Sequence, residues 1–222
     1  MNPQAVIFDM DGVLVDTERA YQDVLRTFFC KRGLEIPDEE LHRLAGGAGG
    51  IYQKMIELWW SRAPRLSERD RELGPLGATG EAFEQITDYG TLINPGVRET
   101  IAELRRRGVR VALASSSRRE KIERVVRDCG LAEHFEVIVS GEDFTESKPN
   151  PAIYLHTLGL LGLPGSACVA VEDSDAGIAA ARGAGIPVAV KRDERFGYRQ
   201  EGGTWMLDSV GDLIPALDAG RG

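Results

Sequence analysis

The sequence predicts a doubly wound parallel α/β sheet with a small all-helical domain inserted after its first strand. Short continuous apolar runs recur along the chain, and such runs are typical of strands that are buried on both faces. Helical patterns alternate with these runs after residue 95, as in parallel α/β folds. Residues 17–92 contain no comparable run and have helical patterns only.

Five apolar runs are the expected strands of the sheet. Parallel strands with helices between them give a Rossmann-like architecture, in which ligands lie outside the carboxyl ends of the strands. Any functional residue is therefore expected to follow the end of a strand. The runs cover residues 5–8, 109–114, 135–139, 167–171 and 187–190.

The helices of the sheet domain carry their own start signals. Ser117 and Glu120 have the spacing of a capping box, which predicts a helix that begins at Ser117. Asn150 followed by Pro151 is typical of an N-cap and a first helical residue. The expected helices cover residues 97–107, 117–129, 150–161 and 174–184.

The insertion divides the chain into two domains. We expect an α/β core made of residues 1–16 and 93–222, and a helical domain over residues 17–92. A chain of 222 residues fits a core with a smaller companion, because one domain takes ~150 residues. The helices expected in the insertion cover residues 18–32, 39–44 and 52–60, with weaker ones between 67 and 89.

Composition restricts the partners and the compartment of the protein. Lys and Arg total 27 against 35 for Asp and Glu, and the net charge of −8 repels a polyphosphate backbone. Three cysteines without a CxxC pair indicate neither a disulfide framework nor a zinc site. The N-terminus has no leader pattern, and no stretch approaches ~18 uninterrupted apolar residues. We therefore expect a cytoplasmic protein, taken to be a monomer, with no nucleic-acid or membrane partner.

Two carboxylates follow the first expected strand. Asp9 and Asp11 are two residues apart, so in extended chain they point to the same side. Two carboxylates ~4 Å apart repel by about 4 kcal/mol at an effective dielectric of ~20, so a proton or a divalent cation must relieve them. A solvated turn is the alternative. A calcium EF-hand loop is disfavoured because Val13 occupies a ligand slot and Gly12 comes too early.

A serine and a lysine follow two further expected strands. Ser115 comes directly before a helix, and the free N–H groups of a helix N-terminus bind phosphate well. Helix capping is the alternative for this serine, although Ser117 already fits that role. Lys148 follows the strand at residues 135–139, and its alternative interpretation is a solvated turn residue.

A second pair of acids follows the strand at residues 167–171. Glu172 and Asp173 are adjacent, and buried acids are costly unless they are paired or bind a metal. Helix capping by Asp173 or Ser174 is the alternative. Four strand ends thus carry acids, a serine, a lysine and acids again, all on one edge of the predicted sheet, which indicates a functional site.

This arrangement resembles the haloacid dehalogenase superfamily of phosphotransferases over nearly the whole chain. Residues 9–17 are similar to its first motif, Ser115 to the second, Lys148 to the third, and Glu172 with Asp173 to the fourth. The helical insertion is similar to the cap domain of the first subclass. The phrases around these residues look most like the β-phosphoglucomutase-like branch, which includes many sugar-phosphate phosphatases.

The resemblance implies phosphoryl transfer through an aspartyl phosphate on Asp9. Asp11 would protonate the leaving oxygen and then take a proton from the hydrolytic water. Ser115 and the amide of Ser116 would hold the phosphoryl oxygens, while Lys148 would balance the charge.

The resemblance also implies Mg²⁺ as the cofactor. Its ligands would be the carboxylates of Asp9 and Asp173 and the backbone carbonyl of Asp11, with Glu172 as a helper. The implied substrate is a small phosphorylated metabolite, for example a sugar phosphate.

Residues of the helical insertion are candidates for substrate contact. They are Thr17, the glycine-rich loop at residues 46–50, and Lys54, for which a solvated helix lysine is the alternative. The charged stretch at residues 191–200 is expected to be a surface loop, and no function is assigned to it.

The choice between phosphatase and mutase depends on the insertion. Mutases of this branch usually carry a histidine at the position of Tyr21. They also carry an arginine in the cap loop that corresponds to residues 46–51, and these residues include no arginine. These differences favour a Mg²⁺-dependent phosphatase, with a β-phosphoglucomutase-type mutase as the alternative. A non-catalytic phospholigand-binding protein is less favoured, because Asp9 and Asp11 are both present.

Overall fold

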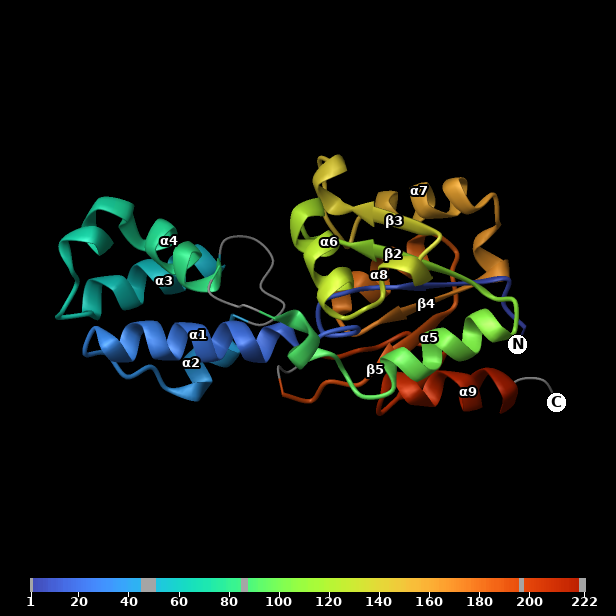
Figure 1. Cartoon of the computed structure of the whole chain (residues 1–222), viewed down its shortest axis with the longest axis horizontal. Helices are drawn as coiled ribbons and strands as arrows, with labels where there is room; N and C mark the ends of the chain where they lie inside the picture. Colours follow the sequence, from blue (N-terminus) through green and yellow to red (C-terminus); the bar gives the residue numbers. More distant parts are fainter. Residues whose placement is uncertain (1, 45–50, 85–87, 196–197, 220–222) are drawn as a thin grey trace. The chain divides into compact units, whose positions relative to one another are not determined.

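The computed structural model describes residues 2–44, 51–84, 88–195 and 198–219 (Figure 1). The chain forms two compact units, one made of Met1–Asp16 with Tyr89–Gly222 and the other of Thr17–Asp88. The helical unit ends at Asp88 rather than at residue 92, because the short 3-10 turn Tyr89–Leu92 belongs to the first unit. Among the described residues, no helix has both the length and the apolar character needed to cross a bilayer.

The first unit contains one six-stranded sheet with the order β3-β2-β1-β4-β5-β6. Every neighbouring pair is parallel, which confirms the predicted doubly wound sheet. β1 lies between β2 and β4, so the ends of these three strands are neighbours. The strands are β1 (Ala5–Phe8), β2 (Arg110–Ser115), β3 (Val137–Ser140), β4 (Cys168–Glu172), β5 (Val188–Lys191) and β6 (Trp205–Leu207).

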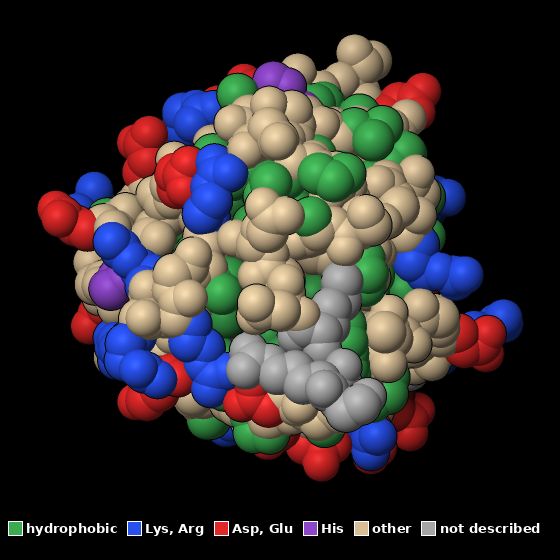
Figure 2. Space-filling view, turned by 90° about the vertical axis from the view of Figure 1, so that its right-hand side faces the viewer, with side chains coloured by type: hydrophobic (Ala, Val, Ile, Leu, Met, Phe, Trp, Pro, Cys, Tyr) green, Lys and Arg blue, Asp and Glu red, His purple; other side chains and the backbone are tan. Residues whose placement is uncertain are grey.

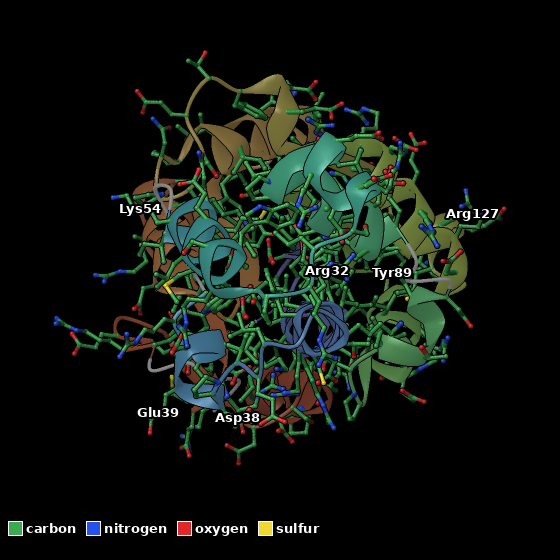
Figure 3. The ribbon with its side chains drawn as sticks, turned by 90° about the vertical axis from the view of Figure 1, so that its left-hand side faces the viewer. Arg32, Asp38, Glu39, Lys54, Tyr89 and Arg127 are labelled. Atoms are coloured by element: carbon green, nitrogen blue, oxygen red, sulfur yellow. The ribbon has the colours of Figure 1, made fainter. Side chains whose placement is uncertain are left out.

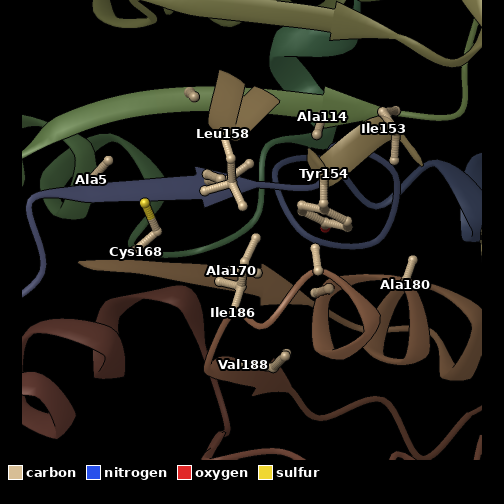
Figure 4. Packing of buried hydrophobic residues seen from close by; sticks show 14 of the residues in the cluster. Ala5, Ala114, Ile153, Tyr154, Leu158, Cys168, Ala170, Ala180, Ile186 and Val188 are labelled. Carbon is tan, nitrogen blue, oxygen red and sulfur yellow. The ribbon is translucent and has the colours of Figure 1, made fainter. Parts of the chain in front are cut away.

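Helices cover the sheet because its strands are apolar on both faces. Alternate residues of the strands, such as Ile7 and Ala170, form one core cluster with Tyr154 and Leu158 of α7 and with apolar residues of α8 (Figure 4). The intervening strand residues are also buried, and α5 contacts both β2 and α9. The helices of this unit are α5 (Val97–Arg106), α6 (Arg119–Asp128), α7 (Ala152–Leu161), α8 (Asp175–Gly183) and α9 (Leu213–Ala219).

Charged side chains are mixed on the surface of this unit. On the face drawn in Figure 2, Lys and Arg side chains lie close to Asp and Glu side chains around a centre of hydrophobic side chains, other uncharged side chains and backbone. Mixed signs of charge are typical of the surface of globular proteins.

The sixth strand was not predicted from the sequence. β6 is short, and its first two residues, Trp205 and Met206, are only half-buried or exposed. A strand at the edge of a sheet needs no continuous apolar run, so the pattern used for the central strands does not detect it.

Two predicted helix starts need correction or refinement. The capping box at Ser117 is wrong, because α6 begins at Arg119 and the Ser117 hydroxyl donates to Asp11 Oδ2 at 2.7 Å instead. The side chain of Asn150 accepts a hydrogen bond from the Ala152 amide at 2.9 Å, so it does support the start of α7.

The helical unit packs around aromatic side chains. Phe29 of α1 meets Trp59 of α3 edge to face, with the ring centroids 5.7 Å apart. The last helix is kinked at Gly74, which directly precedes Pro75. The φ of Gly74 is 70°, which is not a helical value, so the regular helix is interrupted there. The unit consists of α1 (Thr17–Lys31), α2 (Asp38–His42), α3 (Ile51–Arg62) and α4 (Glu68–Glu84).

A part-buried ion pair joins the residue that follows α1 to the last helix of this unit. Arg32, labelled in Figure 3, donates from Nε to Asp70 Oδ2 at 2.9 Å and also pairs with Asp70 Oδ1. The amide of Ser67 donates to the same carboxylate at 2.8 Å. Burial raises the pKa of Asp70, but the hydrogen bonds from Arg32 and Ser67 outweigh it and lower the pKa to about 2.

Replacing Asp70 by asparagine is expected to destabilise the helical unit by about 2 kcal/mol, because Arg32 would lose its buried partner. The contribution of the wild-type carboxylate is complete above about pH 4, and it is lost as the pH falls through the folded pKa of about 2. Urea unfolding followed by tryptophan fluorescence measures the change, because Trp59 and Trp60 lie in this unit. Asp38→Asn, which alters an exposed pair with Arg26, is the matched control and should change stability by less than about 0.5 kcal/mol. Equal stability of the two variants would contradict the assigned role of Asp70.

Candidate active site

Acidic and polar side chains gather where the central strands end. Asp9 directly follows β1, while Ser115 and Glu172 are the last residues of β2 and β4. In the parallel register, Phe8 pairs with Leu113 on one side and with Val171 on the other. The residues that follow these positions therefore meet at one edge of the sheet.

Three carboxylates form a buried cluster at this edge. Asp9, Glu172 and Asp173 each offer an oxygen within 4.8 Å of the others. Their exposed fractions are 8%, 0% and 4%. Burial raises the pKa of Asp9 to about 7 and raises that of Asp173 well above its usual range, and the neighbouring acids add to both shifts. The cluster therefore requires positive charge before all three groups can ionise.

Lys148 supplies one positive charge to the cluster. Its Nζ donates to Asp9 Oδ1 at 2.6 Å, to Glu172 Oε1 at 2.7 Å and to the carbonyl of Ala114 at 3.0 Å. Burial lowers the pKa of Lys148, but the two carboxylates outweigh burial and hold that pKa well above its usual range. The peptide bond between Lys148 and Pro149 is cis.

Tyr154 is a member of the site that the sequence did not reveal. Its hydroxyl, on α7, donates to Glu172 Oε1 at 2.6 Å. The available signal was a tyrosine in a mainly apolar helix, because a buried hydroxyl needs a partner. Glu172 Oε1 thus accepts two hydrogen bonds, while Glu172 Oε2 is buried and accepts none from the described residues.

The cluster fits a divalent cation. Lys148 forms ion pairs with two of the three carboxylates, Asp9 and Glu172, and Glu172 Oε2 is buried without a hydrogen-bond partner among the described residues. The donor set consists of oxygen atoms alone, which suits a hard cation of the magnesium type. The side chain of Asp11 is not part of this cluster, so any contribution of Asp11 would come from its backbone carbonyl.

Two glycines leave room for the acids. At Gly12, which has a φ of 82°, an added Cβ would overlap Asp173 Oδ2. At Gly177, an added Cβ would overlap the carboxylate of Glu172. The Gly177 amide also donates to Ser174 Oγ at 3.0 Å, so Ser174 is the N-cap of α8. Capping and the acid cluster therefore coexist in adjacent residues.

The carboxylate of Asp11 points to α6. Ser117 Oγ donates to Asp11 Oδ2 and Lys121 Nζ donates to Asp11 Oδ1, both at 2.7 Å. Lys121 also donates to Ser117 Oγ at 3.1 Å. Lys121 was not predicted from the sequence, because its contact with Asp11 depends on the conformation of the turn at Ser117 that precedes α6.

The serine turn after β2 exposes one hydroxyl and buries another. Ser115 is 1% exposed, and its Oγ accepts a hydrogen bond from the Ser117 amide at 3.1 Å. Ser116 is exposed, and its Oγ accepts a hydrogen bond from Ser147 at 3.2 Å. Ser115 and Ser116 at the end of β2 and Asp9 at the end of β1 thus lie at the carboxyl ends of adjacent strands, where ligands bind in parallel α/β folds.

The candidate residues of the helical unit are not members of the acid cluster. Thr17 is buried at the start of α1, and Lys54 is exposed on α3 (Figure 3). The loop at residues 46–50 lies outside the described residues. Contact of these residues with a substrate stays a prediction.

The family of the chain follows from its sequence. A family model for haloacid dehalogenase-like hydrolases matches residues 3–185. The chain therefore belongs to the haloacid dehalogenase-like hydrolase family, and it is an enzyme of that family, as the motifs predicted.

Relatives and solved structures agree with this assignment. The chain is 35% identical over 192 residues to the phosphorylated carbohydrates phosphatase of Thermotoga maritima, covering 82% of each chain. A structure of a variant of CbbY from Rhodobacter sphaeroides in complex with xylulose-(1,5)bisphosphate matches with a TM-score of 0.71 and 29% identity, over 95% of this chain and 96% of that chain. A β-phosphoglucomutase from Clostridium difficile matches with a TM-score of 0.73 and 21% identity, over 98% and 96% of the two chains, and shares the fold.

Proposed function

We propose that this protein is a Mg²⁺-dependent phosphatase that acts on a small phosphorylated metabolite, and that this metabolite is a sugar phosphate. The observation that carries the proposal is the buried cluster of the Asp9, Glu172 and Asp173 carboxylates, beside Lys148, at the carboxyl ends of the strands. The carboxylate oxygens, the ammonium of Lys148 and the serine turn suit the transfer of a phosphoryl group. Two relatives support the substrate class. One is named as a phosphatase of phosphorylated carbohydrates, and the structure of the other contains a sugar bisphosphate.

Asp9 is the nucleophile of the proposed reaction. Its carboxylate oxygen forms a bond to phosphorus while the bond from phosphorus to the ester oxygen breaks. Asp11 gives a proton to the departing oxygen and later takes one from the water that attacks the aspartyl phosphate. That second attack releases inorganic phosphate and restores the Asp9 carboxylate.

Lys148 and the serine turn stabilise the charge of the transferring group. Lys148 already contacts the Asp9 carboxylate, so its ammonium remains close when phosphorus bonds to that carboxylate. Ser115 and the Ser116 amide hold the phosphoryl oxygens. Lys121 and Ser117 orient the Asp11 carboxylate through one hydrogen bond to each oxygen.

The acid cluster would hold the metal ion. The carboxylates of Asp9 and Asp173 and the backbone carbonyl of Asp11 are the proposed ligands, with Glu172 as a further donor. A bound Mg²⁺ supplies positive charge that screens the nucleophile from the phosphate and stabilises charge in the transition state.

The helical unit is proposed to act as the cap that selects the leaving group. Thr17, Lys54 and the loop at residues 46–50 are its candidate substrate contacts. A mutase needs a second cationic phosphate site in the cap, and this chain has Tyr21 and an arginine-free loop at the relevant positions. These residues favour hydrolysis over mutase activity.

A panel of phosphorylated sugars and sugar alcohols tests the proposal. Purified protein with Mg²⁺ is expected to release inorganic phosphate from at least one of them, with release abolished by EDTA and restored by excess Mg²⁺. Conversion of β-glucose 1-phosphate to glucose 6-phosphate without phosphate release would establish the mutase instead. Binding of the panel without turnover in Mg²⁺ would make the protein a phospholigand-binding module.

A further inference from the structure

The segment after β5 is more deeply buried than its sequence suggests. The charged stretch at residues 191–200 was expected to be a surface loop. In the structure Lys191, Asp193 and Gln200 are 8%, 4% and 7% exposed. Arg195 forms ion pairs with Asp193 at 2.6 Å and with Asp16 at 2.7 Å, which attach this stretch to the end of the loop that follows β1. The expectation of a plain surface loop is therefore wrong for these residues.

Gln200 adopts a backbone conformation that requires support. Its φ is 50°, and among the described residues it is the one residue other than glycine with a positive φ. Such a conformation is uncommon for glutamine, and it persists where surrounding contacts determine it. Those contacts begin with Asp175, whose Oδ1 accepts a hydrogen bond from the Gln200 amide N–H at 2.7 Å.

The side chain of Gln200 links the ends of two strands. Its Nε2 donates to the carbonyl of Asp173 at 2.6 Å and to the carbonyl of Lys191 at 2.9 Å. Its Oε1 accepts a hydrogen bond from the Asp193 amide at 3.0 Å, which fixes the orientation of the side-chain amide. The last register pair of β4 and β5 joins Glu172 to Val190. Gln200 therefore continues the connection of these strands one residue beyond their ladder.

Asp173 is held from both sides at this point. Its carboxylate lies against Gly12, where an added Cβ would overlap Oδ2. Its carbonyl is bound by Gln200. The peptide plane and the side chain of one residue share a Cα, so fixing the carbonyl restricts the positions that the carboxylate can take. A carboxylate that shares one cation with Asp9 must be placed with little freedom.

We propose that Gln200 is a positioning residue for Asp173 and thereby sets the affinity of the site for Mg²⁺. This inference rests on the proposed metal-dependent function. Groups that orient metal ligands typically change metal affinity by about 10–100-fold when they are replaced. Gln200 acts through the main chain of Asp173 and is not one of the proposed ligands of the ion.

Calorimetric titration of Mg²⁺ into the full chain, without substrate, tests this role. Gln200→Met keeps the length of the side chain and removes its hydrogen bonds, and it is expected to weaken Mg²⁺ binding by about 10–100-fold. Gln200→Gly also relieves the positive φ, so it folds without that strain and is expected to weaken binding in the same range. Thr204→Val is the matched control, because Thr204 lies in the same loop and accepts a hydrogen bond from the Val188 amide at 3.3 Å.

The outcomes separate the two claims. Weaker Mg²⁺ binding by both Gln200 variants, with the Thr204 control within about 2-fold of the wild type, supports the positioning role. Wild-type affinity in either folded Gln200 variant overturns it. Equal weakening by the Thr204 control also overturns it, because the effect would then be a general loosening of the loop. If the wild-type protein itself binds no Mg²⁺, the metal site of the proposed function fails, and this inference fails with it.

Discussion

Asp9→Asn is expected to reduce the turnover of a phosphate monoester by at least about 1,000-fold in saturating Mg²⁺. The amide oxygen of asparagine is a poor nucleophile, and no other carboxylate of the cluster directly follows β1. Steady-state phosphate release on the best substrate of the panel measures the loss.

The same variant is expected to remain folded. Burial raises the pKa of Asp9 to about 7, so ionisation of this group above its ordinary pKa opposes folding in the metal-free protein. Removing the carboxylate should therefore leave the melting temperature unchanged or raise it at pH 8. Asp23→Asn, an exposed acid paired with Arg26, is the matched control for activity. Activity near the wild-type level in folded Asp9→Asn would refute the assignment of the nucleophile.

Lys148→Met is expected to reduce activity by about 100–1,000-fold, because the ammonium that faces Asp9 is lost. The variant should also be destabilised by about 3 kcal/mol, since it leaves two buried carboxylates without their shared partner. The wild-type ammonium contributes at every pH of the assay, because Asp9 and Glu172 outweigh burial and hold the pKa of Lys148 well above its usual range. Phosphate release and chemical unfolding measure the two effects.

A double variant separates charge from packing at this lysine. Adding Asp9→Asn to Lys148→Met removes one of the two unpaired carboxylates, so the double variant is expected to be more stable than Lys148→Met alone. Lys148→Arg keeps the charge and should recover part of the stability. If Asp9→Asn lowers the stability of Lys148→Met instead, the lysine acts through packing, and its role as the counter-charge of the cluster is wrong.

The main features of the site followed from the sequence because strand ends are predictable. Continuous apolar runs located β1, β2 and β4, and parallel pairing brings their carboxyl ends together. Asp9, Ser115 and the adjacent acids Glu172 and Asp173 were therefore predictable as neighbours. Lys148 followed from its place after β3, although its contact with two carboxylates depends on the conformation of the loop that carries it.

The residues that the sequence did not reveal act through particular side-chain conformations. Tyr154 and Gln200 bind groups that are distant in sequence, and no local pattern indicates such hydrogen bonds. Ser117 was assigned to helix capping, but its hydroxyl binds Asp11 because α6 begins two residues later. Lys121, in the first turn of α6, binds the other oxygen of the same carboxylate.

Rapid acid quenching during turnover tests the central claim most directly. Substrate carrying a radioactive phosphate is mixed with the protein and Mg²⁺, quenched in acid within one turnover, and the protein is digested and its peptides are mapped. Label is expected on the peptide that contains Asp9; it should depend on Mg²⁺ and be absent from Asp9→Asn. Label on another residue, or continued turnover with no labelled protein at any quench time, would contradict it.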